Sequence, residues 1–325
     1  MMRRLLAGAA LVLMTAHAYA GEKVIFQLGW LPGGDKAAVY IGVHKGLFAK
    51  EGLDVQILPG RGSADTITKV ATGTADLGEG GLATLMIAKA QGDVPVVAVM
   101  PIFTKQPDVL LVQKGGPVAS LKDVAGKTVA TSPYSSSNVV WPLILRANNI
   151  DPASVTVLKA DPAAMGGMLA TGQVAGVINW VTAAAGTKQA MREQSKQMAE
   201  LSWSDYGFDG CSQCIVASPK LLKAKPETVR KFLKVYMEAE KIMRDDPAAS
   251  AEALHALAPE TDPETVAADA EAALPLIFNE VTKKDGLGTF DPKLVATTWE
   301  WAAKAQNVAT TAIDPMTAID NTLAK

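Results

Sequence analysis

The 325-residue sequence has few of the residues that usually carry catalysis or bind metals. It contains three histidines and two cysteines, and only 6% of its residues are aromatic. His17 falls in the N-terminal leader, His44 lies on a helical stripe and His255 lies in a helical C-terminal region, so no histidine belongs to a recognisable catalytic set. Cys211 and Cys214 lack the further ligands that a zinc site needs. We therefore expect no catalytic residue, no metal and no cofactor, and hence not an enzyme.

Excess charge of either sign is also missing. Lys and Arg number 31 and Asp and Glu 33, which gives a formal net charge of −2, and the chain contains no basic run. Nucleic-acid-binding domains usually carry a basic patch, so the sequence predicts no nucleic-acid partner. After the leader, no apolar run approaches the roughly 20 residues that a membrane span needs. The chain is long enough for two globular domains, and we expect a monomer.

Residues 1–20 have the features of a cleavable signal peptide. Arg3 and Arg4 precede the apolar run 5–14, and the small residues Ala18 and Ala20 suit a signal peptidase. No cysteine follows the cleavage point, so a lipid anchor is not indicated. A retained signal anchor is the alternative. We expect cleavage after Ala20 and release into the periplasm of a Gram-negative cell.

Short apolar runs alternate with helical periodicity, which predicts a layered α/β fold. Val39, Val43 and Leu47 recur at helical spacing in one stripe that ends at Gly52. From Pro219 onward the pattern is almost wholly helical. Strands are predicted at Lys23–Leu28, Asp54–Leu58, Val94–Met100, Val109–Gln113, Thr128–Ala130, Val155–Leu158, Val177–Asn179 and Cys214–Ala217.

A weak internal repeat accompanies this alternation. Residues 52–78 contain a strand, a loop, a helix and an Ala-Thr-Gly turn at 71–73, and residues 149–177 repeat this order with Ala-Thr-Gly at 170–172. Glycine directly after a helix suits a left-handed C-cap. Either the halves are structurally related, or any two α/β units look alike at this level.

Several segments in a fixed order carry a family resemblance. They are Leu28–Pro32, Gly46–Val55, Ala71–Gly78, Leu121–Val129 and Ser218–Val229. In these segments the chain resembles the nitrate/sulfonate/taurine and thiamine-pyrimidine-precursor branch of ABC-transporter substrate-binding proteins. The resemblance implies a type II periplasmic-binding-protein fold, with two α/β lobes joined by a hinge. It also implies a small-molecule solute as ligand, and an ABC permease and ATPase as partners.

In that fold, the first lobe contains both ends of the chain and the second is inserted between them. The resemblance therefore implies a first lobe of residues 21–108 plus 214–325 and an inserted lobe of residues 109–213.

Ligands of open α/β sheets bind beyond the carboxyl ends of the strands, and five loops there carry candidate contacts. A tryptophan beside a Gly-Gly pair offers a flat face, and three serines before residue 139 exceed what one N-cap needs. The candidate ligand-binding residues are Trp30, Arg61, Ser63, Glu79, Tyr134, Ser135, Ser136, Ser137, Asn138, Asn179 and Trp180.

Each candidate also has a structural interpretation. Trp30 can belong to the core, Arg61 can be solvated, and Ser63 can cap a helix whose free N–H groups receive an anion or carbonyl. Glu79 can lie in a plain turn at Gly78–Gly81. The serines can simply cap a helix.

The aromatic candidates favour a flat polar heterocycle or an aromatic acid over an inorganic anion. The acidic residue and proline that sulfonate-type members of the family often have after Asn179 are missing, which disfavours sulfonate or nitrate. Such an anion, or a sensing role at a membrane receptor, remains an alternative. A pyrimidine synthase would need a cysteine-rich motif that this chain lacks.

The Cys211-Ser212-Gln213-Cys214 segment has the spacing of a redox pair. A thioredoxin-like pair opens a helix, however, whereas this one precedes an apolar strand. A structural disulfide is plausible in an oxidising compartment only if the segment turns, since an extended chain separates the two residues too far.

Overall fold

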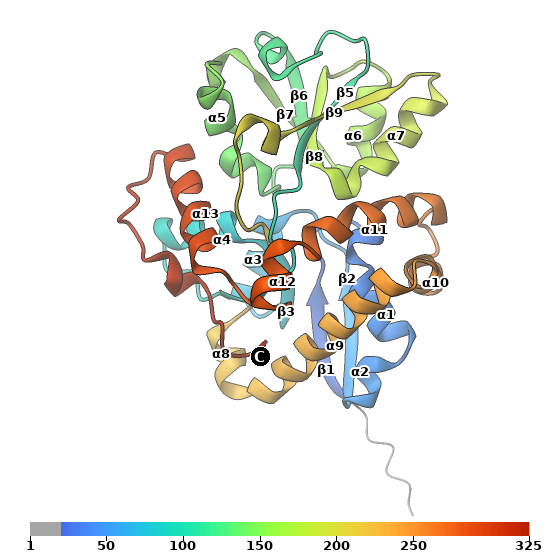
Figure 1. Cartoon of the computed structure of the whole chain (residues 1–325), viewed down its shortest axis with the longest axis vertical. Coiled ribbons are helices and arrows are strands. Elements are labelled where there is room, and N and C mark those ends of the chain that lie inside the picture. The colour runs from blue at the N-terminus through green and yellow to red at the C-terminus, as the bar shows by residue number, and fades with distance from the viewer. Residues whose placement is uncertain (1–20, 325) are drawn as a thin grey trace, which may run out of the picture.

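The computed structural model describes residues 21–324, so the predicted signal peptide lies outside the described part of the chain. Two lobes are stacked along the long axis of the molecule (Figure 1). Each lobe contains one five-stranded sheet with helices packed against it. The prediction of a layered α/β fold is therefore confirmed.

The lower lobe in Figure 1 contains both ends of the described chain and the first sheet. Its strands are β1 (Glu22–Gln27), β2 (Leu53–Leu58), β3 (Leu77–Gly81), β4 (Val97–Pro101) and β10 (Gln213–Ala217), in the order β2-β1-β3-β10-β4. β1 runs parallel to β2 and β3, whereas β10 is antiparallel to β3 and β4. Val24 and Phe26, two residues apart on β1, are buried in the same core.

The upper lobe contains the second sheet. Its strands are β5 (Asp108–Gln113), β6 (Thr128–Thr131), β7 (Thr156–Lys159), β8 (Gly176–Trp180) and β9 (Met198–Ser202), in the order β7-β6-β8-β5-β9. β6 runs parallel to β7 and β8, and β5 is antiparallel to β8 and β9. Trp141 stacks on Trp203 in this lobe's core, with their ring centroids 5.3 Å apart.

The helices cover both sheets. The upper lobe has α5 (Ser137–Ala147), α6 (Pro162–Ala170), the short helix η4 (Val181–Ala183) and α7 (Ala184–Glu193). The lower lobe has the short helix η1 (Gly34–Lys36), α1 (Ala37–His44), α2 (Leu47–Lys50), α3 (Ser63–Ala71), α4 (Leu82–Gln91), α8 (Pro219–Ala224), α9 (Pro226–Asp245), α10 (Ala248–Leu257), α11 (Pro263–Ile277), α12 (Glu280–Asp285) and α13 (Pro292–Ala305). The helical C-terminal region predicted from Pro219 onward is confirmed.

All eight predicted strands form, with shifted ends, but the sequence interpretation missed two others. The predicted turn at Gly78–Gly81 is wrong, because these residues belong to β3, which pairs with both β1 and β10. Several glycines in a row usually indicate a turn. Here the missing side chains let neighbours approach closely: a Cβ at Gly78 would lie 2.5 Å from the Thr66 side chain. The edge strand β9 lacks β-branched residues and gave no signal.

The predicted helical stripe ending at Gly52 is also interrupted earlier. α1 ends at His44, and Gly46 has a φ of 64°, so a new short helix begins at Leu47. Val39 and Phe48 are buried, whereas His44 is exposed.

Two connections join the lobes, residues 102–107 from β4 to β5 and residues 203–212 from β9 to β10. They lie side by side: the Ser212 N–H donates to the Phe103 carbonyl at 3.0 Å, and Gln106 Nε2 donates to the Cys211 carbonyl at 3.3 Å. The lobe boundaries at 108/109 and 213/214 stay a prediction.

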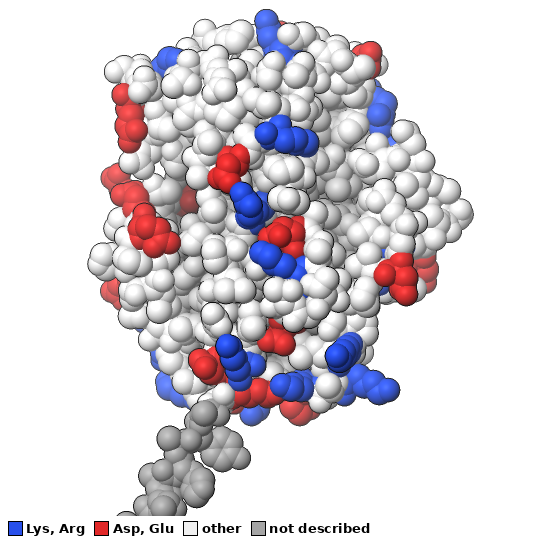
Figure 2. Space-filling view, turned by 180° about the vertical axis from the view of Figure 1, so that it is seen from behind, with Lys and Arg blue, Asp and Glu red and all other residues white. Residues whose placement is uncertain are grey.

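Within residues 21–324 no helix combines the length and the apolar character required to cross a bilayer. On the face shown in Figure 2, basic and acidic side chains are interspersed rather than gathered into one large patch of one sign.

Candidate ligand-binding cleft

A narrow pocket lies between the two lobes. Its walls come from segments that follow strands: residues 29–36 after β1, 62–63 after β2, 135–136 after β6 and 179–183 after β8. These are carboxyl ends of parallel strands in both sheets. The position agrees with the rule that α/β sheets bind ligands there.

The structure brings six of the sequence-predicted residues to this pocket. They are Trp30, Ser63, Ser135, Ser136, Asn179 and Trp180. Arg61 and Tyr134 instead line a separate depression on the outside of the lobe junction. Glu79, Ser137 and Asn138 do not line the pocket.

The two tryptophans reach across the cleft from opposite lobes. Trp30 belongs to the lower lobe but packs against the apolar core of the upper lobe. Trp180, at the end of β8 in the upper lobe, packs against the lower lobe's core, with its ring 6.0 Å from that of Phe103. Each lobe thus contributes one aromatic side chain to the contact between them.

Asp108, which the sequence interpretation missed, fixes the position of Trp180. The Trp180 indole N–H donates to Asp108 Oδ1 at 3.2 Å, and the Ser137 hydroxyl donates to the same oxygen. Burial raises the pKa of Asp108 to about 6, although these hydrogen bonds lower it. Ser137 therefore lies behind the cleft wall, where it helps to position Trp180 through Asp108, and does not line the pocket itself. The signal for Asp108 in the sequence was an acidic residue at the start of an apolar strand.

Ser63 does not cap α3, so its interpretation as a helix cap is wrong. Gly62 occupies the N-cap position, and the Ser63 hydroxyl accepts the Gly81 N–H at 2.8 Å. This bond ties the first turn of α3 to the end of β3 at the edge of the pocket.

Glu79 is buried in the lower lobe instead of lying in an exposed turn. Its carboxylate accepts the Gly29 N–H at 3.2 Å, Gln213 Nε2 at 3.0 Å and the Tyr236 hydroxyl at 3.0 Å. Burial raises its pKa, although the nearby Lys36 opposes the shift. With both oxygens occupied, Glu79 holds Gly29 in place and is not available to a ligand.

The remaining candidates make protein contacts. Asn138 Nδ2 donates to the Ser132 carbonyl at 2.8 Å, and Asn138 Oδ1 accepts Lys159 Nζ at 2.8 Å. Arg61 pairs with Asp161 of the other lobe at 2.8 Å, with both side chains more than half exposed. Tyr134 is 41% exposed.

Hydrogen bonds between the lobes show that the cleft is closed. The Ser132 hydroxyl of the upper lobe donates to the Arg61 carbonyl at 2.8 Å, and the Ala64 N–H donates to the Tyr134 carbonyl at 3.2 Å. On the other side of the cleft, the Thr182 hydroxyl donates to Asp35 Oδ2 at 2.9 Å.

Asp35 and Lys36, which the sequence interpretation did not single out, form an ion pair at the pocket. Both are almost completely buried. Burial lowers the pKa of Lys36, but the neighbouring carboxylates of Asp35 and Glu79 outweigh it and hold that pKa above its usual range. The ammonium group is therefore already neutralised by protein.

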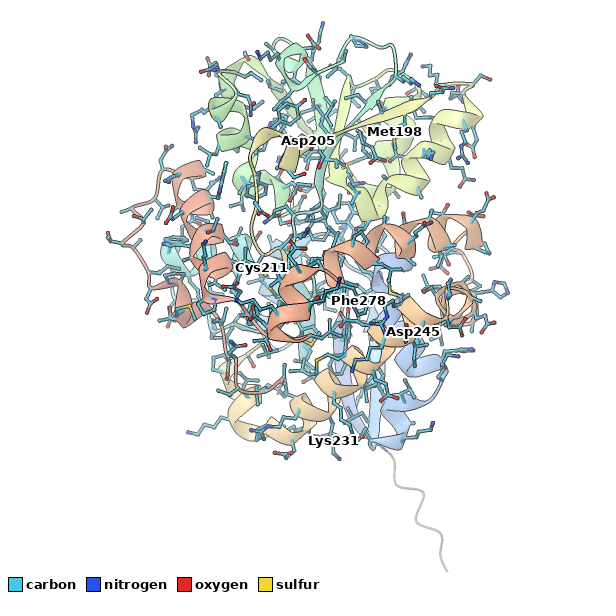
Figure 3. All side chains as sticks on the ribbon, in the orientation of Figure 1. Met198, Asp205, Cys211, Lys231, Asp245 and Phe278 are labelled. Carbon is cyan, nitrogen blue, oxygen red and sulfur yellow. The ribbon has the colours of Figure 1, made fainter. Side chains whose placement is uncertain are left out.

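Cys211 and Cys214 are buried free thiols. Figure 3 shows Cys211 where the chain returns to the lower lobe. Burial raises the pKa of Cys214, and Cys211 adds to the shift. A disulfide between them stays a prediction. No group of three side chains suited to a metal ion lies within residues 21–324.

Comparisons with known proteins agree with this architecture. The sequence model of the family described as NMT1/THI5 like matches residues 34–250. The riboflavin-binding protein RibY of Chloroflexus aurantiacus is 25% identical over 317 residues, which cover 92% of this chain and 85% of that protein. The 4-amino-5-hydroxymethyl-2-methylpyrimidine phosphate synthase THI11 of Saccharomyces cerevisiae is 21% identical over 234 residues, covering 70% of this chain and 68% of that protein.

Among solved structures, the alkanesulfonate-binding protein SsuA of Xanthomonas axonopodis pv. citri, bound to MOPS, has a TM-score of 0.70. It is 15% identical, and the match covers 93% of this chain and 98% of that chain. This likeness confirms the predicted periplasmic-binding-protein fold.

Proposed function

The chain belongs to the NMT1/THI5-like family, and on that basis we propose that it is the solute-binding component of an ABC importer and captures a small, flat, polar heterocyclic molecule between its lobes. The observation that carries the proposal is the pair of tryptophans, Trp30 and Trp180, that line one interlobe pocket from opposite sides. Aromatic faces with a few hydroxyl and amide groups suit a flat ligand with polar edges.

The charges around the pocket support a heterocycle over a bare anion. Lys36 is the basic residue that lines it, and its ammonium group is paired with Asp35. Arg61 is paired with Asp161 outside the pocket. A sulfonate or nitrate would find no unpaired cation among the lining residues. The name of the relative RibY also points to a flat heterocycle, whereas the MOPS bound by SsuA keeps a sulfonate as the competing ligand class.

The proposal includes a periplasmic location and a monomer that delivers its solute to a permease and ATPase without chemical change. The side-by-side connections at residues 102–107 and 203–212 are the proposed hinge, between a lobe of residues 21–108 plus 214–325 and one of residues 109–213. Closure on the ligand is the signal to the importer, because contacts made in both lobes stabilise only the closed state.

Thermal unfolding with candidate ligands tests this function. We expect riboflavin or 4-amino-5-hydroxymethyl-2-methylpyrimidine to raise the Tm, since ligand at 100 times its Kd adds about 2.7 kcal/mol of stability. MOPS and nitrate should leave the Tm unchanged. A Tm shift with MOPS alone would indicate that the ligand is a sulfonate and not a heterocycle. Conversion of a bound heterocycle to product would indicate that the protein is an enzyme and not a binding protein.

Variants then test the pocket itself by calorimetry. Trp30→Ala and Trp180→Ala should each weaken the binding of the heterocycle by about tenfold or more, because aromatic contacts contribute ~0.5–1.5 kcal/mol beyond burial of area. Tyr134→Ala is the matched control, since Tyr134 is exposed outside the pocket and should bind as the wild type does. Wild-type affinity in both tryptophan variants would contradict the assignment of the cleft.

A further inference from the structure

Two buried carboxylates meet beside Gly33, where the pocket continues toward α6, α7 and α11. Asp35 lies on η1 and Asp269 on α11, and each is only 6% exposed. A Cβ placed on Gly33 would lie 3.3 Å from Asp35 Oδ1 and 3.5 Å from Asp269 Oδ2. These two oxygens therefore converge on one point of the cleft, which the missing side chain at residue 33 keeps open.

The converging oxygens have no protein partner. Asp35 uses its other oxygen for Lys36 and Thr182, and Asp269 uses its other oxygen for the Ala185 N–H at 3.4 Å. Neither Asp35 Oδ1 nor Asp269 Oδ2 accepts a hydrogen bond from any residue in the described range 21–324. Both oxygens border the cleft, so they are free to accept hydrogen bonds from a group bound there.

The rest of this part of the cleft carries the same sign of charge. Asp35 and Asp269 line the part next to Trp30, and the outer part adds Glu260 and Asp262. No lysine or arginine lines either part. Lys36 offsets the charge of Asp35 through its ion pair. Asp269, Glu260 and Asp262 are therefore the lining groups whose negative charge favours a positive group over a negative one.

From this geometry we infer that Asp35 and Asp269 form a subsite for a cationic group of the ligand, an ammonium or amidinium, next to the ring held by the tryptophans. The inference rests on the proposed function, which it narrows to heterocycles that carry a basic substituent. An ammonium group has three donors and can bridge both oxygens. Charge-assisted hydrogen bonds of this kind are among the strongest in proteins, and burial strengthens them further.

The pKa of Asp269 agrees with a subsite for a cation. Burial, with Asp35 close by, raises the pKa of Asp269 to about 8. A carboxylate in this position is therefore poorly compensated by the protein alone. A bound cation would favour its charged form, since an opposite charge within a few ångströms lowers a carboxyl pKa.

Three probes that share one ring and carry a positive, a neutral or a negative substituent test the inference by calorimetry. They are 4-amino-2-methylpyrimidines that carry at carbon 5 an aminomethyl, a hydroxymethyl or a carboxylate group. We expect the amine to bind at least tenfold more tightly than the alcohol, and the carboxylate most weakly. Asp269→Asn should reduce amine affinity at least tenfold and change alcohol affinity less than about twofold, because the amide keeps an acceptor for Ala185 but loses the charge.

Two further variants secure the result. Glu271→Gln removes an exposed acidic group from the same helix and should leave all three affinities unchanged. If Asp269→Asn does not fold, Gly33→Ala serves in its place. Its Cβ would fill the point between the two oxygens and should abolish the preference for the amine.

The outcomes separate the two proposals. Equal binding of amine and alcohol to the wild-type protein, or an undiminished amine preference in Asp269→Asn or Gly33→Ala, would overturn the cation subsite and leave the heterocycle-binding function standing. Binding of none of these probes and no binding of riboflavin would overturn both.

Discussion

Asp108 is the residue whose ionisation matters most for the position of Trp180 in the cleft. Burial raises its pKa from the ordinary 3.8 to about 6. The folded state then binds this proton more tightly than the unfolded state. The stability contributed by Asp108 is consequently complete below about pH 4 and is lost as the pH rises through about 6.

Asp108→Asn should remove this dependence, because an amide stays neutral at every pH. Relative to wild type, we expect the variant's free energy of unfolding to rise between pH 4 and pH 7 by up to about 3 kcal/mol, as a shift of one pKa unit is worth about 1.4 kcal/mol. Denaturant unfolding at pH 4.0, 5.5 and 7.0 measures the difference. Asp205→Asn, at an exposed aspartate, is the control, and identical curves for the two variants would refute the role of Asp108.

At the scale of an element, the serines at the start of α5 divide into two groups. Ser135 and Ser136 face the pocket, whereas Ser137 is buried against Asp108. Replacing both Ser135 and Ser136 by alanine should weaken binding of the heterocycle about tenfold, since one or two hydrogen bonds to the ligand are lost. The Tm should change little. Ser137→Ala should instead lower stability by about 1–3 kcal/mol, because a buried acceptor loses a donor.

Calorimetry and thermal unfolding of both variants separate the two effects. A double variant that melts early but binds normally, or a Ser137→Ala protein that is stable but does not bind, would reverse this division of the helix.

For the whole molecule, closure brings the backbones of the two lobes into close contact at Gly62. Gly62, with a φ of 140°, lies directly beneath the upper lobe, and a Cβ there would lie 2.3 Å from the Tyr134 carbonyl oxygen. Gly62→Ala should therefore keep the lobes apart and weaken ligand binding by at least tenfold. Small-angle scattering should show no compaction of the variant when ligand is added.

Gly73→Ala is the matched control for this prediction. Gly73 follows the other end of α3, also has a positive φ, and has no neighbour within 4 Å of an added Cβ. Strain from the backbone alone would affect both variants, whereas a block to closure would affect only Gly62→Ala. Normal compaction of Gly62→Ala would show that this contact does not control closure.

The sequence alone determined most of the order of strands and helices, and the loops that carry the site. Periodicity is local, so it placed Trp30, Ser136, Asn179 and Trp180 directly after strands or before helices, where the fold then brought them to one cleft. The same local information misplaced Gly78–Gly81, since glycines in a central strand are explained only by the neighbours that pack on them.

Only the tertiary structure decided which side chains meet. The convergence of Asp35 with Asp269, the bonds that occupy Glu79, and the pairing of Arg61 with Asp161 all join residues that are far apart in the chain. Such contacts depend on how helices pack and how the lobes close. Local patterning therefore identified the walls of the cleft, but its floor and its charge follow from packing across the two lobes.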